Sequence, residues 1–372
     1  MAEPAPADRV RFAGRALPFF GQQLWRLLLT ILTLGFHRFW WKTWQRRFLW
    51  ANTTIDGDPL EYQGKGSELL VGALIAMVLF TIPYVVGFNL ATMLMMRADM
   101  VSILIGVALM LATVLAIFFL IGFAVHRAVR YRLSRTAWRG IRGGMHPNSW
   151  AYARLSFKWF ALQLLTLGLV TPMADAARWN ALMEDATFGT LDVAPRLAPA
   201  RLWPGFWTSF GVALGGLALL AVLILFPHIE NLGWMVEEMA DTEREDLSPE
   251  AGLGFAALLG FIFLSFPLFA LAGLPYRAAF LREALGATAI GPVRLGFSAR
   301  LLDWFWWVLG NVALVIVTLG LGTLLLLWRQ WAFWMRYLTL EGEFNLEMLE
   351  QTRLERPRQG EGLADAFDVG GF

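Results

Sequence analysis

Histidine and cysteine are scarce in this chain, and this limits the chemistry that its side chains can perform. Cysteine is absent, which excludes disulfides, thiolate metal sites and cysteine nucleophiles. The four histidines, at positions 37, 126, 146 and 228, form neither an HExxH nor an HxxxH pair. No GxSxG segment occurs. We therefore predict no catalytic residues, no metal ligands and no cofactor, and we do not expect an enzyme.

An acidic segment at 230–250 is the best candidate for a cation site. It holds eight Asp and Glu residues and one basic residue, Arg244. Clusters of carboxylates suit Ca²⁺ or Mg²⁺. The spacing matches no EF-hand loop, however, and no glycine stands where the sharp turn of that loop requires one. We predict a solvated acidic loop without a specific metal.

Three polar residues lie inside apolar segments and are candidates for a buried polar site: Arg26, Gln163 and Asn311. Polar groups at membrane depth are costly and often mark the path of a substrate or ion. The alternative is structural. Arg26 would extend its charge to the interface, and Asn311 would bond to a neighbouring helix.

A series of arginines follows a long apolar run, and its spacing is close to helical. Those that we predict to contact anionic phospholipid are Arg127, Arg130, Arg135, Arg139 and Arg142. Each arginine beside an anionic membrane surface contributes about 1 kcal/mol of binding. Basic charge that only orients the neighbouring spans would give the same pattern. No recognisable nucleic-acid-binding module accompanies the series, so we expect no nucleic-acid partner.

The apolar residues are gathered in long uncharged runs. Apolar types make up 57% of the chain and charged types only 16%, whereas a soluble domain has about 25% charged residues. Each run is long enough to cross a hydrocarbon core of about 30 Å as a helix, and a helix satisfies its own backbone in lipid. We predict an all-α polytopic membrane protein. The runs cover residues 69–90, 100–125, 205–227, 251–276 and 304–328.

An internal repeat is the most informative pattern. The triplet Thr-Leu-Gly occurs at 33–35, 166–168 and 318–320, and residues 12–57 align without a gap on 297–342 with 14 identities in 46 positions. Such self-similarity indicates repeated structural units. We predict an N-terminal tail at 1–11, repeat units at 12–147 and 148–293, a partial unit at 294–350 and a disordered tail at 351–372.

Short β signals flank these triplet segments. Asp56-Gly57 and Glu341-Gly342 each lie between residues that favour strands. We predict small β-hairpins at the membrane surface, near 52–62 and 338–346.

The segments around the first triplet resemble a known family. The resemblance rests on four motifs: TLG, FWWKTWQRRFLW at 39–50, NTTIDG at 52–57 and SRTAWRGIRGG at 134–144. Together they resemble the YjgN-like family of bacterial inner-membrane proteins, a domain of unknown function. The resemblance implies a location in the inner membrane and supplies no catalytic residues. The middle triplet segment lacks the basic stretch and the Asn-Thr.

The distribution of basic residues favours four membrane spans. If only 69–90, 100–125, 205–227 and 251–276 cross, 27 basic residues lie on one side and two on the other. If all seven apolar segments cross, the division is only 18 and 11. Because cytoplasmic flanks collect Lys and Arg, we predict four spans with both termini in the cytoplasm. The triplet segments would then enter and return, or lie in the interface.

The repeats and the short triplet segments favour a transport or permease-like function, since both features are typical of transporters. The alternative is a structural or assembly scaffold of the membrane that binds anionic lipid or a partner protein. The sequence leaves open whether the chain forms a homo-oligomer.

Overall fold

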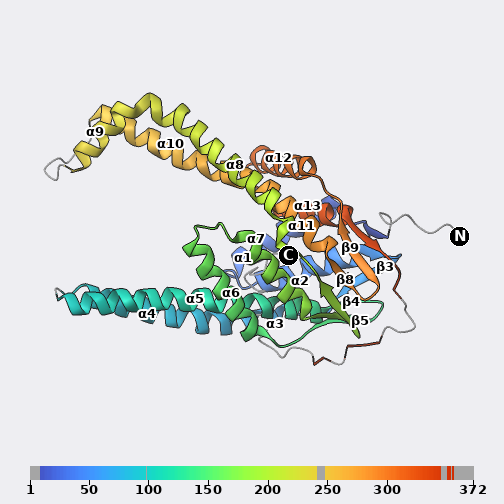
Figure 1. Ribbon diagram of the computed structural model, residues 1–372. Helices are drawn as coiled ribbons and strands as arrows, with labels where there is room; N and C mark the ends of the chain where they lie inside the picture. Colours follow the sequence, from blue (N-terminus) through green and yellow to red (C-terminus); the bar gives the residue numbers. More distant parts are fainter. Residues whose placement is uncertain (1–8, 98, 241–247, 345–349, 353, 356–372) are drawn as a thin grey trace. The chain divides into compact units, whose positions relative to one another are not determined.

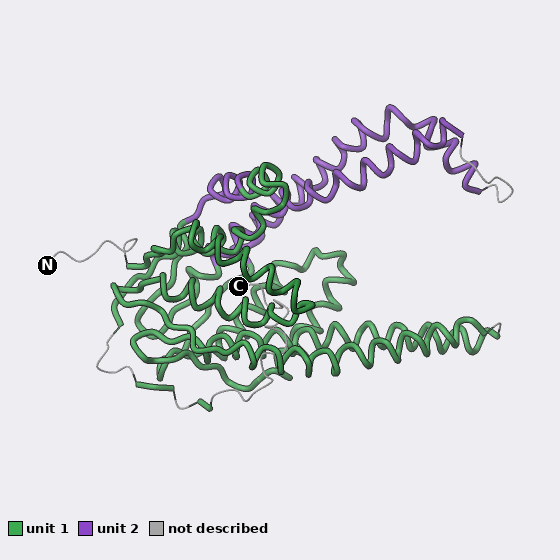
Figure 2. Tube along the Cα trace, turned by 180° about the vertical axis from the view of Figure 1, so that it is seen from behind, with its two compact units in different colours: residues 1–199, 284–298, 311–372 green, residues 200–283, 299–310 purple. Residues whose placement is uncertain are grey.

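The computed structural model describes residues 9–97, 99–240, 248–344, 350–352 and 354–355. These residues are mostly helical and also form ten short strands (Figure 1). They divide into two compact units, which Figure 2 shows in different colours. Unit 1 comprises residues 1–199, 284–298 and 311–372, and unit 2 comprises residues 200–283 and 299–310.

All ten strands form one antiparallel sheet within unit 1. Each strand pairs with the strands that precede and follow it in the chain. The strands are β1 (Val10–Phe12), β2 (Thr53–Ile55), β3 (Asp58–Tyr62), β4 (Thr136–Trp138), β5 (Ile141–Met145), β6 (Ala186–Phe188), β7 (Leu191–Pro195), β8 (Thr288–Ile290), β9 (Val293–Phe297) and β10 (Leu338–Glu341).

This sheet corrects the prediction of an all-α fold with small, separate surface hairpins. The hairpins exist, but they pair with one another in a single sheet. Strands of three to five residues leave most of their backbone donors and acceptors unpaired when they stand alone. Pairing with the next hairpin satisfies these groups and leaves few exposed edges.

Tight two-residue turns set the register of the hairpins. Ile55 pairs with Asp58 and Trp138 pairs with Ile141, so each turn contains two residues. In the first turn Asp56 and Gly57 have φ of 49° and 86°, and in the second Arg139 and Gly140 have 51° and 76°. Two successive positive φ values match the right-handed twist of paired strands, and this is why Asp-Gly is a strong hairpin signal.

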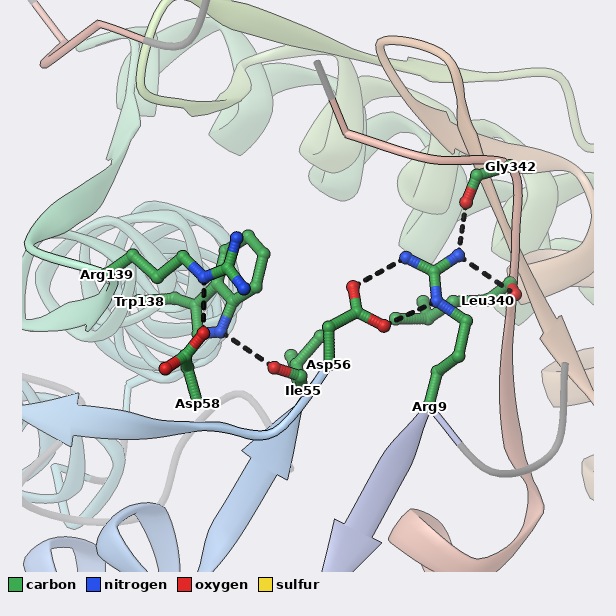
Figure 3. Close-up of polar contacts among 8 residues, drawn as sticks. All are labelled: Arg9, Ile55, Asp56, Asp58, Trp138, Arg139, Leu340 and Gly342. Carbon is green, nitrogen blue, oxygen red and sulfur yellow. Dashed lines mark hydrogen bonds and ion pairs between the residues drawn. The ribbon is translucent and has the colours of Figure 1, made fainter. Parts of the chain in front are cut away.

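The two end strands of the sheet lie beside each other, so that the sheet almost closes. Val10 of β1, Val293 of β9 and Leu340 of β10 share one buried cluster. Arg9 donates to the carbonyl oxygens of Leu340 and Gly342, and its Nε and Nη2 each lie 2.6 Å from a carboxylate oxygen of Asp56 (Figure 3). The hydrogen bond from Arg9 lowers the pKa of Asp56, although partial burial opposes the shift.

Between strands the chain leaves the sheet five times and returns to it each time. Three excursions are short helical hairpins and two are long ones. The short ones are α1 (Ala16–Leu32) with α2 (Arg38–Ala51), α6 (Ser149–Leu165) with α7 (Thr171–Glu184), and α12 (Leu301–Val317) with α13 (Thr323–Tyr337).

The first long excursion comprises α3 (Gly66–Ala76), the π-helix η2 (Met77–Thr81), α4 (Ile82–Met95) and α5 (Met100–Arg135). The second comprises the 3₁₀-helix η3 (Pro199–Arg201), α8 (Trp203–Leu220), the π-helix η4 (Ala221–Leu225), the 3₁₀-helix η5 (Phe226–His228), α9 (Ile229–Ala240), α10 (Pro249–Ala272) and α11 (Leu274–Gly286).

The long excursions contain four helices that are long and apolar enough to cross a membrane. They cover Gly66–Met95, Met100–Arg135, Trp203–Ala240 and Pro249–Gly286, and each contains one of the four predicted spans. The fifth apolar run, 304–328, is broken by the turn between α12 and α13. In both units a π-helix precedes a proline, Pro83 or Pro227, which removes one backbone donor and forces a wider turn.

The ion pair between Arg9 and Asp56 predicts a dependence of stability on pH. Because the pKa of Asp56 is lower in the folded chain, the pair stabilises the sheet fully above about pH 4, the pKa of an unfolded aspartate. This contribution is lost as the pH falls through the folded pKa. Asp56→Asn should lower the free energy of unfolding by about 1–3 kcal/mol at pH 7. In detergent, the melting temperature of this variant should also fall less than that of the unmodified protein as the pH is lowered below about 4.

Asp58→Asn is the matched control. The ion pair of Asp58 with Arg139 is more exposed, with 47% of the Asp58 side chain accessible, and exposed pairs contribute about 0–1 kcal/mol. Equal losses of stability in the two variants would contradict the proposed closure of the sheet by Arg9.

Candidate functional site in the helical hairpins

The Thr-Leu-Gly triplets form the tips of the three short helical hairpins. At each tip the leucine is left-handed, with φ of 50°, 50° and 48° at Leu34, Leu167 and Leu319. The glycine that follows also has a positive φ, and its N–H donates to the carbonyl five residues earlier, at 2.7–2.8 Å. This hydrogen bond is typical of a helix that ends in a left-handed residue.

The threonine of each triplet closes the last turn of the first helix. Thr33, Thr166 and Thr318 donate their hydroxyls to the carbonyl four residues earlier, at 2.6–2.7 Å. In the first and third tips the same hydroxyl accepts a backbone N–H from beyond the turn. Each residue of the triplet therefore has a separate structural task, and the leucine accepts a conformation that costs a non-glycine residue roughly 1–2 kcal/mol.

The first hairpin encloses polar nitrogen atoms that have no partner. Gln23 is fully buried, and its Oε1 accepts hydrogen bonds from Trp41 Nε1 and from Gln45 Nε2. Its own Nε2 has no hydrogen-bond partner, and the same holds for the buried Nε of Arg26 and Nε2 of His37. The amide nitrogen of Gln23 and the Nε of Arg26 are donors that an anion would satisfy, whereas the role of His37 Nε2 depends on the tautomer of the ring.

The first and third hairpins use equivalent positions to join their two helices. In the first, the guanidinium of Arg26 lies over the ring of Trp44, 4.6 Å from its centroid. In the third, Arg329 Nε donates to Asn311 Oδ1. Asn311 and Arg329 stand 285 positions after Arg26 and Trp44, which is the offset of the sequence alignment.

In the middle hairpin both polar atoms of the Gln163 side chain have partners within the hairpin. Gln163 Oε1 accepts from Arg178 Nη2 at 2.6 Å, and Gln163 Nε2 donates to Thr171 Oγ1 at 3.1 Å. Arg178 also pairs with Asp175 at 3.2 Å. The three candidates Arg26, Gln163 and Asn311 therefore lie in three different hairpins, and each interacts within its own hairpin.

The arginines predicted to contact lipid have partners within the protein. Arg135 Nε lies 2.9 Å from Glu68 Oε2, and both side chains are largely buried. Lipid contact stays a prediction for the whole series. The other contacts are Arg127 over Phe123 at 5.1 Å, Arg130 to the Met145 carbonyl at 3.2 Å, Arg139 to Asp58 at 2.5 Å, and Arg142 to the Leu354 carbonyl.

A buried cluster of His126, Ser149 and Asp185 escaped the sequence analysis. The His126 nitrogens Nδ1 and Nε2 lie 3.0 Å from Ser149 Oγ and 3.0 Å from Asp185 Oδ2. These residue types resemble a hydrolase triad, but His126 is 0% and Ser149 5% exposed, so no substrate reaches the hydroxyl in this structure. The cluster instead fastens α6 and the end of α7 to α5. Its members are far apart in the sequence, so no local motif marks them.

The acidic segment lies only partly within the described residues, because residues 241–247 are outside them. Among the described residues, no group of three or more His, Asp or Glu side chains is placed to hold a metal ion. Glu238 accepts a hydrogen bond from the backbone N–H of Ser248 at 2.8 Å.

The chain has the features of an integral membrane protein. It has long apolar helices, a sheet to which every excursion returns, and polar groups inside helical hairpins. The chain belongs to DUF898, a family of bacterial proteins of unknown function whose model matches residues 7–366. The YjgN-like proteins that the sequence resembles are part of this family. No curated protein and no solved structure matches the chain.

His126→Ala should weaken the contact of α6 and α7 with α5. The substitution opens a cavity and removes the His126 partner of the buried Ser149 hydroxyl, and these losses together cost about 2–4 kcal/mol. Asp185 keeps its hydrogen bond from Asn148. Thermal unfolding of the purified protein in detergent measures the loss. His146→Ala, at an exposed position, is the control and should change little. Covalent labelling of Ser149 by a fluorophosphonate would contradict the structural role.

Proposed function

We propose that this chain is a bacterial inner-membrane protein that crosses the membrane four times, with its C-terminus and N-terminus in the cytoplasm. Two helical hairpins supply the four crossings, and each returns the chain to the sheet. The sheet and its flanking segments then lie on one side, with 27 basic residues against two in the linkers 91–99 and 228–250. Such an excess of basic residues favours the cytoplasmic side.

We also propose that the chain arose from a repeated unit, with copies at 12–147 and 148–293 and a partial copy at 294–350. The order strand, helix, triplet turn, helix, strand occurs three times, and a long helical excursion follows the first two. The copies would stand in the same orientation, because each long excursion crosses the membrane twice.

The function that this arrangement supports best is the transport of an anionic solute. The observation that carries it is the set of unpartnered nitrogens of Gln23, Arg26 and His37 inside one hairpin. Buried donors without partners are costly, and an anion that passes or binds transiently would satisfy them. Helices interrupted by short turns that carry polar groups are typical of transporters.

The alternative is a membrane scaffold that binds anionic lipid or a partner protein. The arginines at the membrane-facing ends of α5 and of the neighbouring strands favour it. Arg127, for example, lies over the ring of Phe123 on a helix of spanning length. Such a protein needs no solute path, so flux measurements separate the two functions.

Arg26→Ala should abolish an anion response that the intact protein shows. Proteoliposomes containing the purified protein would be tested with inorganic phosphate and with succinate, both for flux and for a saturable rise in thermal stability. Removal of the guanidinium should reduce either effect by at least about tenfold, corresponding to about 1.4 kcal/mol. Arg154→Ala, at an exposed position of α6, is the control. Flux that persists in Arg26→Ala, or its absence in every variant, would favour the scaffold.

Single cysteines test the topology directly, because the chain has none of its own. In intact cells, an impermeant thiol reagent should spare cysteines at Ala7, Glu61 and Ala366. The same reagent should label cysteines at Ala98 and Ala240. A labelled N-terminus together with a protected tail would require an odd number of crossings and would end the four-span proposal.

A further inference from the structure

We propose that the tips of the three short helical hairpins insert into the acyl-chain region of the membrane from the side of the sheet, with the hairpins forming re-entrant elements that do not cross. The occupant of the tip surface is lipid. This inference rests on the proposed membrane location of the long helices and does not depend on transport.

The tip leucines are the first observation. Leu34, Leu167 and Leu319 are 91%, 91% and 95% exposed and also left-handed. In water a leucine at such a position gains nothing from its side chain, whereas glycine or asparagine would avoid the steric cost. An apolar medium around the tip gives the leucine side chain a favourable environment. The same combination occurs at three tips in one chain.

The depth of the second hairpin follows from its register on α5. Ring pairs place Phe123 beside Trp150 and Phe118 beside Phe160, at 4.4 and 4.0 Å between centroids. Leu167 lies seven residues beyond Phe160, which is about 10 Å along a helix. Between the two ring pairs α6 advances ten residues while α5 advances five. The level of Leu167 on α5 therefore lies between Phe118 and Leu111, near the middle of the uncharged run 100–125.

The surface of α5 at this level is also apolar and exposed, since Leu111 is 58% and Leu104 61% accessible. In Figure 1 the α6–α7 hairpin accordingly ends partway along the α4–α5 pair. The tip therefore continues a surface that a spanning helix already presents to acyl chains, at about mid-depth.

Charged residues near each tip set different depths for the three hairpins. In the first, Arg38 begins α2 only four residues after Leu34. In the third, the nearest charged residue is Arg329, ten residues after Leu319 and about 15 Å away. Because a charged group stays near the headgroups, the third hairpin should insert most deeply and the first least.

Depth-dependent quenching tests this order. Single cysteines at Leu34, Leu167 and Leu319 would carry a fluorophore in liposomes that contain nitroxide lipids labelled at the headgroup or along the chain. Leu319→Cys should lose most fluorescence to the deepest nitroxide, Leu167→Cys to a mid-chain one and Leu34→Cys to a shallow one. Leu111→Cys is the lipid-exposed control and Asp58→Cys the aqueous one.

Quenching of all three tips by aqueous iodide, with Leu111→Cys still quenched by lipid, would overturn the insertion while leaving the membrane location intact. Quenching of Leu111→Cys by aqueous iodide would instead contradict the proposed membrane location of the long helices. A tip cysteine that reacts with an impermeant reagent on the side of Ala98 would show that the hairpin crosses.

Discussion

The shortness of the strands is the constraint on which the rest of the structure depends. A strand of three residues, such as β2 or β4, satisfies its backbone only if a neighbour lies on each side. Every helical excursion must therefore end where it began, at the sheet. A chain held in this way crosses any bilayer an even number of times, whatever the length of its helices. In the proposed topology the sheet keeps both ends of each excursion on one side of the membrane, and hydropathy determines which excursions are long enough to cross.

The short hairpins combine two opposing tendencies. Their tips are apolar and their helices are joined by polar contacts, such as Arg329 with Asn311 and Arg178 with Gln163. In an apolar medium such contacts hold two helices together more effectively than leucine packing does, because lipid is as apolar as leucine. The first hairpin departs from this plan. It leaves nitrogens of Gln23 and Arg26 without partners, and this difference makes it the candidate site.

The sequence predicts the apolar part of the fold well and the polar part poorly. Long uncharged runs locate all four long helices because a single property, hydropathy over about 20 residues, decides them. The pairing of β3 with β4 joins Tyr62 to Thr136 across a whole helical excursion, and no local pattern carries that information. The arginines between 127 and 142 are predicted to contact lipid from their spacing alone, and that pattern does not reveal that Arg135 and Arg139 pair with Glu68 and Asp58.

For the candidate residues too, the sequence predicts their positions but not their partners in the folded chain. The spacing of the triplets predicts that Arg26 and Asn311 hold equivalent positions, whereas their contacts with Trp44 and Arg329 depend on the geometry of the folded hairpins. The cluster around His126 depends on three segments that meet only in the folded chain.

The closure of the sheet by Arg9 also has a consequence for biosynthesis. Arg9 and the Leu340 carbonyl are 331 residues apart, and a ribosome adding about 5–20 residues per second needs roughly 20–70 s to make that length. During this time β1 pairs with β2, but Arg9 lacks its partners at Leu340 and Gly342. Arg9 directly precedes β1 and Arg11 lies within it. Charge on an exposed strand discourages pairing with other chains. The basic start of the sheet thus has the charge that disfavours edge-to-edge pairing while the last strand is still being made.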